Sequence, residues 1–310
     1  FAWLCYRFVE RPLRSSPRSS AAAIGLCVLM TATGATGYYI YRNDGLADRK
    51  INLINGNQEA FDWRADHIQS DACRVFVGKR KLPYCLQSSD RKPTVALLGD
   101  SHGNALFPFF DQFFAKRQQG VLMLGSAGCP PFLNVDRDGF SCKKVTPVAV
   151  EYVVQDPSIT DVYLTGRFAA VENGTYSIKS TERPQTMDRR AIFKDSLEAT
   201  IKKLADAKKK ITIILHAPEL DFDPRSCLAS RGRSPCAIDK NSVLARQAGY
   251  RKIIRELGTS YSFRTLDLLD AFCDAKFCYA QSDGKILYRD SHHLGVYGLD
   301  LLARKSWGFP

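Results

Sequence analysis

The chain has 310 residues, of which 45% are hydrophobic and 25% charged, with 21 glycines and 14 prolines. This composition is that of an ordinary globular protein of one or two domains and excludes collagen-like and disordered chains. The net charge of +12 and the pI near 9.2 would permit nucleic-acid binding. However, the basic residues are scattered and form no patch interleaved with aromatic residues, so no nucleic-acid partner is expected. Anionic lipid headgroups or acidic glycans are simpler partners for this charge.

The first apolar feature of the chain is the uncharged run Ala21–Tyr41 (AAAIGLCVLMTATGATGYYIY). At about 1.5 Å per residue, a helix of this length spans roughly 30 Å, the thickness of a bilayer core. A signal peptide also carries an apolar run, but this one is longer than an h-region and lacks a convincing small-residue cleavage site before its tyrosines. Residues 21–41 are therefore predicted to form one retained transmembrane helix.

Residues 1–20 indicate on which side of the membrane the rest of the chain lies. The apolar start FAWLCY begins at Phe1 and not at Met, so it is expected to be the tail of a preceding membrane helix. The short loop that follows carries four arginines against the lone acid Glu10. The positive-inside rule places such a loop in the cytoplasm, and everything after Tyr41 outside it.

Eight of the ten cysteines fall as four close pairs after the membrane run, whereas Cys5 and Cys27 lie in the apolar segments. The pairs are Cys73–Cys85, Cys129–Cys142, Cys227–Cys236 and Cys273–Cys278. Each pair flanks turn residues that bring chain ends together, so local disulfides are expected. A metal site is the competing interpretation, but no CxxC pair occurs and no His stands at zinc-finger spacing, so no metal is expected. Disulfides require an oxidising compartment such as the periplasm.

The stretch 42–93 is polar and is predicted to be a periplasmic linker or extension without a core of its own. Phe61, Trp63 and the first cysteine pair give it something to bury, so we expect it to pack against the domain that follows. That domain is predicted to occupy residues 94–310.

From Thr94 onward, short apolar runs alternate with helical patterns. The predicted strands are Thr94–Leu98, Val121–Gly125, Val162–Thr165, Ile211–His216 and, more weakly, Phe263–Leu268. The predicted helices are Arg189–Lys208, Asn241–Leu257 and Gly295–Lys305. This alternation predicts an α/β fold with a parallel sheet between helices, whose ligand site lies beyond the carboxyl ends of the strands.

Two short segments carry candidate catalytic residues. LGDSHGN (Leu98–Asn104) places Ser101 where the first predicted strand of this domain turns into a helix. DSHHLG (Asp290–Gly295) precedes the last helix, and its Asp290 and His293, three positions apart, are expected to meet across a helical turn. The carboxylate would then hold the imidazole tautomer that takes a proton from Ser101. His292 is expected to project about 100° away around that turn.

The string GDSHG also satisfies the GxSxG pattern of the α/β-hydrolase elbow. That elbow normally lies deep in a sheet, with the acid and the His on separate later loops. Here the serine follows the first strand of its domain and the acid and the His are three residues apart, which favours a different fold.

GDSH after the first strand, with DxxH before the final helix, resembles the SGNH/GDSL hydrolase superfamily, whose fold is a flavodoxin-like parallel sheet with helices on both faces. YRFVERPLR (Tyr6–Arg14), followed by one more span, resembles the end of the acyltransferase-3 membrane domain in OafB-like O-antigen acetyltransferases. Those proteins carry such an SGNH domain at their C-terminus. The two resemblances together cover most of the chain.

The resemblance implies that Ser101 is the nucleophile, His293 the general base and Asp290 its orienting partner. It also implies Gly128, within Ser126–Cys129, as an oxyanion residue whose peptide N–H acts with that of Ser101. Where many members have GxND after the third strand, this chain has TGRF, so Arg167 occupies the position of the Asn.

Three roles are open for Arg167: an oxyanion contact, a contact to an acidic part of the acceptor, or a structural ion pair. Asn104 is a candidate substitute for the missing Asn, although an Asn in the first turn of a helix is more often a capping residue. The other histidines have simpler interpretations. His102 and His216 are expected to pack or line the site, and His67 is expected to be an exposed linker residue.

An acyl-serine intermediate can pass its acyl group to water or to a sugar hydroxyl. The resemblance to acyltransferase-3 proteins favours transfer, namely O-acetylation of a bacterial surface polysaccharide such as the lipopolysaccharide O-antigen. It implies a same-chain acyltransferase-3 membrane domain as partner, a polysaccharide acceptor and a location in the bacterial inner membrane with the catalytic domain in the periplasm. No cofactor is expected in this domain, and cytoplasmic acetyl-CoA is the implied ultimate donor. A periplasmic carbohydrate acetylesterase is the alternative, and a glycan-binding scaffold with a degenerate site is a third hypothesis.

Overall fold

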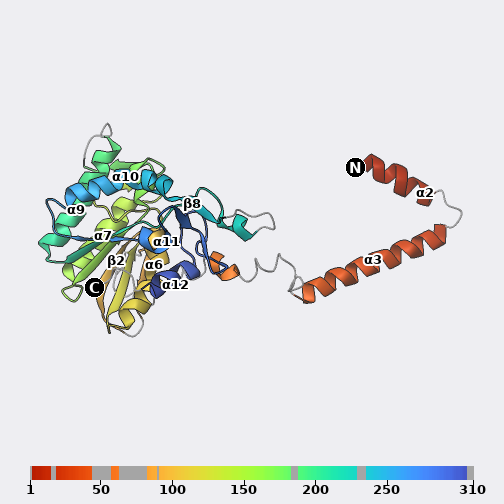
Figure 1. The fold of residues 1–310 in the computed structure, drawn as a ribbon, viewed down its shortest axis with the longest axis horizontal. Coiled ribbons are helices and arrows are strands. Elements are labelled where there is room, and N and C mark those ends of the chain that lie inside the picture. The colour runs from red at the N-terminus through yellow and green to blue at the C-terminus, as the bar shows by residue number, and fades with distance from the viewer. Residues whose placement is uncertain are drawn as a thin grey trace. The chain divides into compact units, whose positions relative to one another are not determined.

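The structure, a computed structural model, describes residues 2–14, 19–43, 57–62, 82–88, 91–182, 188–228 and 235–305. The chain divides into two compact units, Phe1–Gly56 and Asn57–Pro310 (Figure 1). The second unit contains the α/β fold.

The first unit is helical in its described residues. Its elements are α1 (Ala2–Cys5), the π-helix η1 (Tyr6–Glu10), α2 (Arg11–Arg14) and α3 (Ser19–Arg42). Within α3, Ala23–Arg42 is long and apolar enough to cross a membrane, with a mean hydropathy of 1.4. The hydroxyls of Thr31 and Thr33 donate to backbone carbonyls one turn earlier, which satisfies these polar groups inside the helix. The apolar run 21–41, predicted to be a transmembrane helix, thus lies within a helix that is a candidate membrane span.

Within the described residues, the central sheet of the second unit has six strands in the order β1-β3-β2-β5-β7-β9. Its strands are β1 (Tyr84–Gln87), β2 (Pro93–Gly99), β3 (Gly120–Gly125), β5 (Asp161–Thr165), β7 (Lys210–Leu215) and β9 (Arg264–Asp267). All neighbours are parallel except β1, which pairs antiparallel with β3.

The described residues also form three two-stranded antiparallel sheets. They are β4 (Val135–Arg137) with β6 (Ile178–Ser180), β8 (Ala237–Asp239) with β10 (Phe277–Tyr279), and β11 (Gln281–Ser282) with β12 (Lys285–Ile286). Arg137 is the last residue of β4.

Helices cover both faces of the sheet (Figure 1). The helices and helical turns are η2 (Gln58–Phe61), α6 (Ser101–Ala115), α7 (Cys142–Gln155), α8 (Phe168–Glu172), α9 (Arg189–Asp206), η4 (Pro224–Leu228), α10 (Lys240–Leu257), α11 (Leu269–Phe272) and α12 (Val296–Arg304). One core contains Ala96 and Leu98 of β2 with residues of α7, α9 and α10. The other contains Val95 and Leu97 with residues of α6 and α12. Alternate side chains of one buried strand therefore enter opposite cores, as a parallel sheet with two covered faces requires.

The five predicted strands of the sheet are all present, each within two residues of its predicted bounds. The three predicted helices are present as α9, α10 and α12. Together they confirm the predicted fold class, a parallel-dominated α/β sheet between helices.

The predicted linker 42–93 needs a correction, because part of it belongs to the sheet. Tyr84–Gln87 forms the edge strand β1, and β2 begins at Pro93. Four residues carry too little periodic pattern to be recognised as a strand in the sequence; hydrogen bonding to β3 makes them one.

The described residues 57–62 of the same stretch also pack against the α/β fold. The Asn57 side-chain oxygen accepts a hydrogen bond from the Ile286 peptide N–H at 2.9 Å. The Arg225 guanidinium lies over the Phe61 ring at 4.3 Å. Trp63, His67 and Cys73 lie outside the described residues, so the predicted Cys73–Cys85 bond is not described, although Cys85 itself is disulfide-bonded.

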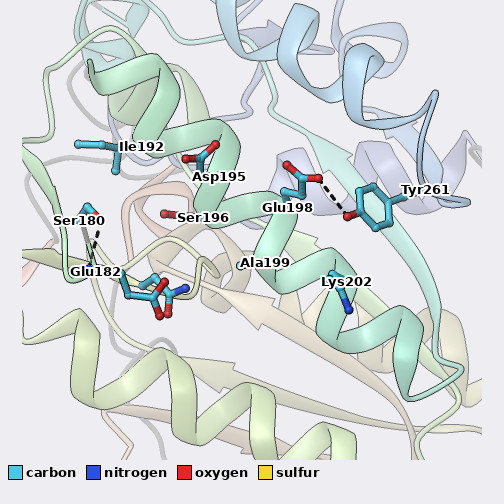
Figure 2. A pocket seen from close by; sticks show the side chains of 10 residues that line it. Ser180, Glu182, Ile192, Asp195, Ser196, Glu198, Ala199, Lys202 and Tyr261 are labelled. Carbon is cyan, nitrogen blue, oxygen red and sulfur yellow. Dashed lines mark hydrogen bonds between the residues drawn. The ribbon is translucent and has the colours of Figure 1, made fainter. Parts of the chain in front are cut away.

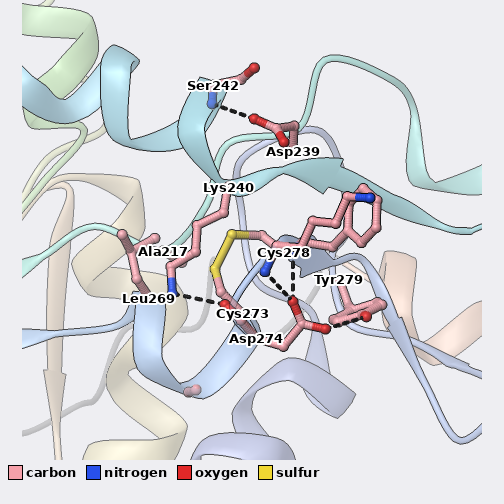
Figure 3. The surroundings of a disulfide bond; sticks show 12 residues. Ala217, Asp239, Lys240, Ser242, Leu269, Cys273, Asp274, Cys278 and Tyr279 are labelled. Atoms are coloured by element: carbon pink, nitrogen blue, oxygen red, sulfur yellow. Dashed lines mark hydrogen bonds between the residues drawn. A yellow bond between two sulfur atoms is a disulfide. The ribbon is translucent and has the colours of Figure 1, made fainter.

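The other three predicted disulfides are present: Cys129–Cys142, Cys227–Cys236 and Cys273–Cys278. Figure 3 shows the surroundings of the third, where the Asp274 carboxylate accepts hydrogen bonds from the peptide N–H groups of Lys276 and Phe277. Each bond closes a short loop after an element of the fold. The loops are thereby constrained without a large core of their own.

The carboxyl ends of three neighbouring strands approach one another unusually closely. Gly99 of β2 lies opposite Gly125 of β3 and Thr165 of β5. A Cβ added at Gly125 would lie 1.7 Å from the Gly99 carbonyl oxygen. Because β3 and β5 lie on either side of β2, the chain reverses its direction of winding here, and such a switch point is where open α/β sheets form their ligand sites.

We predict that Gly125→Ala destabilises the second unit by about 3 kcal/mol or more, because the new methyl group must displace backbone and not a flexible side chain. Thermal unfolding of the chain in detergent, followed by circular dichroism, measures the effect. Gly34→Ala is the matched control, since its methyl meets no atom within 4 Å. Equal melting of Gly125→Ala and the parent chain would contradict this prediction.

Candidate active site

Ser101 stands at the carboxyl end of β2 as the first residue of α6. The preceding residue, Asp100, is the N-cap, and its carboxylate accepts a hydrogen bond from the His102 peptide N–H at 2.9 Å. A carboxylate at this position accepts a hydrogen bond from one of the free N–H groups at the helix start, and the helix dipole stabilises its negative charge. The cap thereby fixes where α6 begins and presents the Ser101 hydroxyl beyond the edge of the sheet.

Asp290 and His293 lie in a loop and not on the predicted helical turn. The loop is closed by an antiparallel bridge between Tyr288 and Leu294, and α12 begins only at Val296. Within it, one oxygen of Asp290 accepts the peptide N–H groups of His292 at 2.8 Å and His293 at 2.7 Å. The acid therefore organises the loop that carries its own partner, which the three-residue spacing alone did not reveal.

The loop brings the His293 ring between Asp290 and Ser101. His293 Nδ1 lies 2.8 Å from Asp290 Oδ2, and His293 Nε2 lies 2.8 Å from Ser101 Oγ. Burial tends to raise the pKa of Asp290, but the hydrogen bond and charge of His293 and the loop N–H groups hold that pKa well below its usual range. An ionised Asp290 keeps the proton on Nδ1, so that Nε2 presents its lone pair to the serine hydroxyl.

Arg167, predicted at the position of the missing Asn, lies in a buried ion pair. Its Nε and Nη2 are 3.2 and 2.8 Å from the two oxygens of Glu219, which Arg246 also approaches at 3.3 Å. Burial tends to raise the pKa of Glu219, and the Arg167 hydrogen bond lowers it below its usual value. Of the three roles open to Arg167, this geometry favours the structural ion pair. The Arg167 peptide N–H also donates to Asp100 at 3.0 Å, which ties this turn to the cap of α6.

His102 and His216 form a buried pair beside the His293 ring. His216 Nε2 and His102 Nδ1 share a hydrogen bond of 2.7 Å, and the His102 ring stacks on His293 with centroids 4.3 Å apart. Burial lowers the pKa of His216 from 6.5 to about 4, and burial with the neighbouring His216 lowers the pKa of His102 well below 6.5. Both rings are therefore neutral at pH 7, and stacking His102 on His293 does not repel an imidazolium that forms there.

The peptide N–H groups of Ser101 and Gly128 have no hydrogen-bond partner among the described residues. Gly128 has a φ of +64°, a conformation that favours glycine. Its carbonyl accepts a hydrogen bond from Arg137 Nη1 at 3.0 Å. These free donors agree with the predicted oxyanion residues, whose role stays a prediction.

Asn104 is buried in the first turn of α6. The cap of that helix is Asp100 and not Asn104, so the capping interpretation of Asn104 does not hold. Its role as a substitute for the missing Asn stays a prediction.

Comparison with known proteins agrees with this geometry. Residues 66–306 match the family described as the SGNH domain fused to AT3 domains. The chain belongs to this family.

Solved structures resemble this SGNH domain at low sequence identity. The periplasmic domain of a lipopolysaccharide acetyltransferase from Salmonella ser. Paratyphi A aligns with a TM-score of 0.55 and 15% identity, over 84% of this chain and 96% of that one. An acetyl xylan esterase aligns with a TM-score of 0.41 and 18% identity, over 69% and 98%. A GDSL-like lipase from Bacteroides thetaiotaomicron aligns at 0.39 and 11%, over 68% and 86%. No curated protein matches the chain by sequence.

The SGNH domain also contains a group of imidazoles with the composition of a metal site. Ring nitrogens of His102, His292 and His293 lie within 4.8 Å of one another. However, the His102 and His293 rings are stacked at 14°, so their lone pairs lie in two nearly parallel planes and do not converge on one ion. Both nitrogens of His293 are already engaged by Asp290 and Ser101. The arrangement fits a stack of rings better than a coordination shell.

A separate pocket of about 250 Å³ lies along α9, and no triad residue lines it (Figure 2). Its lining includes Glu182, Asp195, Glu198, Lys202 and Tyr261. Figure 2 shows the Tyr261 hydroxyl donating to Glu198, a bond of 3.0 Å. This pocket is therefore separate from Ser101, His293 and Asp290.

Sequence reasoning missed the residues that hold the site in place. Asp100 stands inside the GDSH motif, so its proximity to Ser101 was visible, but its bond to Arg167 was not. No motif in the sequence pointed to Glu219 or Arg137. Glu219 pairs with Arg167 from 52 positions away, and the Arg137 side chain reaches the Gly128 carbonyl from strand β4.

We predict that the buried imidazole of His216 makes the SGNH domain less stable in mild acid. Because its folded pKa lies below the unfolded value of 6.5, the unfolded chain binds a proton between pH 6.5 and about 4 that the folded chain does not. The free energy of unfolding should therefore fall between pH 7 and pH 5, by on the order of 2 kcal/mol for this group. Denaturant unfolding of the parent chain and of His216→Gln at both pH values measures it. The variant should lose less stability on acidification, and an identical loss in both proteins would refute the assignment.

Proposed function

We propose that this SGNH domain is an acyltransferase that O-acetylates a sugar hydroxyl of a bacterial surface polysaccharide, such as the lipopolysaccharide O-antigen, through an acyl-serine intermediate. The observation that carries the proposal is the continuous hydrogen-bonded line from Asp290 through His293 to Ser101, with both contacts at 2.8 Å. An acid, an imidazole and a serine in this order are the parts of nucleophilic acyl transfer.

In the first half of the proposed reaction, Ser101 Oγ attacks the carbonyl carbon of an acyl donor. Its proton passes to His293 Nε2, and the ionised Asp290 stabilises the resulting imidazolium. The free peptide N–H groups of Ser101 and Gly128 are the proposed donors to the oxyanion of the tetrahedral intermediate. When that intermediate collapses, the imidazolium returns the proton to the leaving group and the acyl group stays on Ser101.

In the second half, a sugar hydroxyl attacks the acyl-serine ester. His293 accepts the hydroxyl proton as the bond to the acyl carbon forms, and gives it back to Ser101 Oγ as the ester bond to the serine breaks. The neutral His102 ring against His293 supports this exchange, because it places no positive charge beside the imidazolium. Water in place of the sugar would make the same site an esterase.

The context of the domain supports transfer over hydrolysis. Its family comprises SGNH domains fused to AT3 domains, and the candidate membrane helix precedes it in the chain. We therefore propose an acyltransferase-3 membrane domain in the same polypeptide as partner, with cytoplasmic acetyl-CoA as ultimate donor. The three described disulfides support an oxidising compartment, for which we propose the periplasmic side of the inner membrane. The name of the Salmonella structure, a periplasmic domain of a lipopolysaccharide acetyltransferase, agrees with this location and acceptor class.

The triad proposal distinguishes the two adjacent histidines. We predict that His293→Ala lowers turnover of an aryl acetate by about three to six orders of magnitude, as Ser101→Ala does, because the serine then keeps its proton. His292→Ala should keep most of the activity, because its ring lies beside the triad and burial lowers its pKa to about 3, too low for a base at neutral pH. Asp290→Asn should fall between the two. Steady-state kinetics on folded variants would contradict this if His292→Ala were as inactive as Ser101→Ala.

The acceptor decides between transfer and hydrolysis. We predict that the chain in detergent, given an aryl acetate together with surface polysaccharide fragments, forms acetylated sugar that mass spectrometry detects, and that Ser101→Ala forms none. Acceptor should also accelerate release of the aryl group, because deacylation by the sugar is faster than by water. Acetate release at one rate with and without acceptor, and no acetylated sugar, would identify an esterase instead.

A further inference from the structure

Arg137 contacts the turn after β3 and Arg167 lies in the turn after β5, and the two arginines differ in how their charge is balanced. Arg167 forms an ion pair of 2.8 Å with Glu219, a carboxylate that Arg246 also approaches at 3.3 Å. Arg137, on β4, has no ion pair among the described residues, although acids flank it in sequence. Those acids are already engaged: Asp136 lies 3.0 Å from Lys143, and Asp138 lies 2.7 Å from Lys179. Arg137 therefore carries an uncompensated positive charge in a half-buried position.

The Arg137 guanidinium is held in one orientation by its surroundings. Its Cζ lies 3.9 Å from the centre of the Phe140 ring and 3.7 Å from that of Tyr176. Its Nη1 donates to the Gly128 carbonyl at 3.0 Å. Two aromatic contacts and one hydrogen bond fix the plane of the group, which is the condition for recognising a planar or tetrahedral oxyanion with little loss of entropy.

The backbone around Arg137 is equally constrained. Strand β4 pairs with β6, and the Cys129–Cys142 disulfide closes the loop that contains both Arg137 and Phe140. The Nε and Nη2 donors of Arg137 have no protein acceptor among the described residues. Both donors belong to the same planar guanidinium group, which can donate two parallel hydrogen bonds to two oxygens of a carboxylate or phosphate.

Arg137 is linked to the proposed acyl site through its hydrogen bond to Gly128, the proposed oxyanion residue. It contacts Gly128, in the loop after β3, and Ser101 follows β2, whose Gly99 is in register with Gly125 of β3. An anion bound by the free N–H groups of Arg137 would lie beside the Gly128 turn, which carries the proposed oxyanion donor.

We propose that Arg137 is the acceptor-recognition residue of this domain and that it binds an anionic group, a carboxylate or a phosphate, on the sugar to be acylated. The assignment rests on the proposed function, since it names the class of acceptor for that site. An anionic glycan also agrees with the net charge of +12. The alternative is that Arg137 only supports the Gly128 turn and meets no ligand.

Binding without turnover tests this assignment. The chain carrying Ser101→Ala, purified in detergent, is titrated by calorimetry with methyl glucuronide, a glucose phosphate, methyl glucoside and inorganic phosphate. We expect at least one anionic sugar to bind roughly 10- to 100-fold more tightly than the neutral glucoside, which is the contribution of a charge-assisted pair. Arg137→Gln in the same background should abolish that preference. Arg137→Lys should keep part of it, because the charge remains and the planar guanidinium group does not.

The matched control is Arg117→Gln. Arg117 also lies over an aromatic ring, 3.9 Å from the centre of Phe113, but it follows the far end of the helix that Ser101 begins. Arg117→Gln removes the same charge and the same kind of aromatic contact as Arg137→Gln, but at a distant position. The preference for anionic over neutral sugar should therefore stay unchanged in this variant. Circular dichroism on every variant separates loss of binding from loss of folding.

Several outcomes would overturn the proposal. Equal affinity for anionic and neutral sugars in the Ser101→Ala chain would do so without any Arg137 variant. A preference that survives in folded Arg137→Gln and Arg137→Lys would assign recognition elsewhere, and inorganic phosphate binding as tightly as the anionic sugars would exclude glycan recognition. Failure of the acetyl-transfer assay would leave these affinities readable, so the two proposals can fail separately.

Discussion

The site depends on two hydrogen bonds that the buried carboxylate of Asp100 accepts. One oxygen accepts the peptide N–H of His102 at 2.9 Å and the other that of Arg167 at 3.0 Å. Burial raises the pKa of this acid, and the two peptide N–H groups oppose that rise by stabilising the anion. One side chain thus joins the start of α6 to the turn after β5, so the serine and the Arg167 turn cannot move independently.

Around this contact, the two sides of the site are built differently. On one side, Arg167 is ion-paired with Glu219. The neutral imidazoles of His216 and His102 share a hydrogen bond, and His102 stacks on His293, the proposed base. On the other side, Arg137 donates to the Gly128 carbonyl and has no ion pair among the described residues. A neutral support suits a base that must gain and lose a proton, whereas an unpaired cation suits contact with an anionic group.

Physical reasons explain which parts of the fold were predictable. β2 and β3 are buried on both faces, so their sequences are continuous apolar runs, which predict buried strands. α9 has an apolar face at helical spacing, which predicts a helix. β1 was not predictable, because four residues acquire strand character only by pairing with β3. The loop at Asp290 was misjudged as a helical turn for a similar reason, since its shape comes from the Tyr288 and Leu294 bridge and from hydrogen bonds to the acid itself.

By itself, the sequence determined the α/β class, the candidate membrane helix and the identity of Ser101, Asp290 and His293 as candidates, because these depend on residue type and local spacing. Only the tertiary structure decided what surrounds them. It paired Arg167 with Glu219 across 52 positions, joined Ser101 to His293 across 192, and left Arg137 without a carboxylate partner in the described part of the chain. Whether a charge is neutralised depends on neighbours that chain folding brings together, and no local pattern in a single sequence records them.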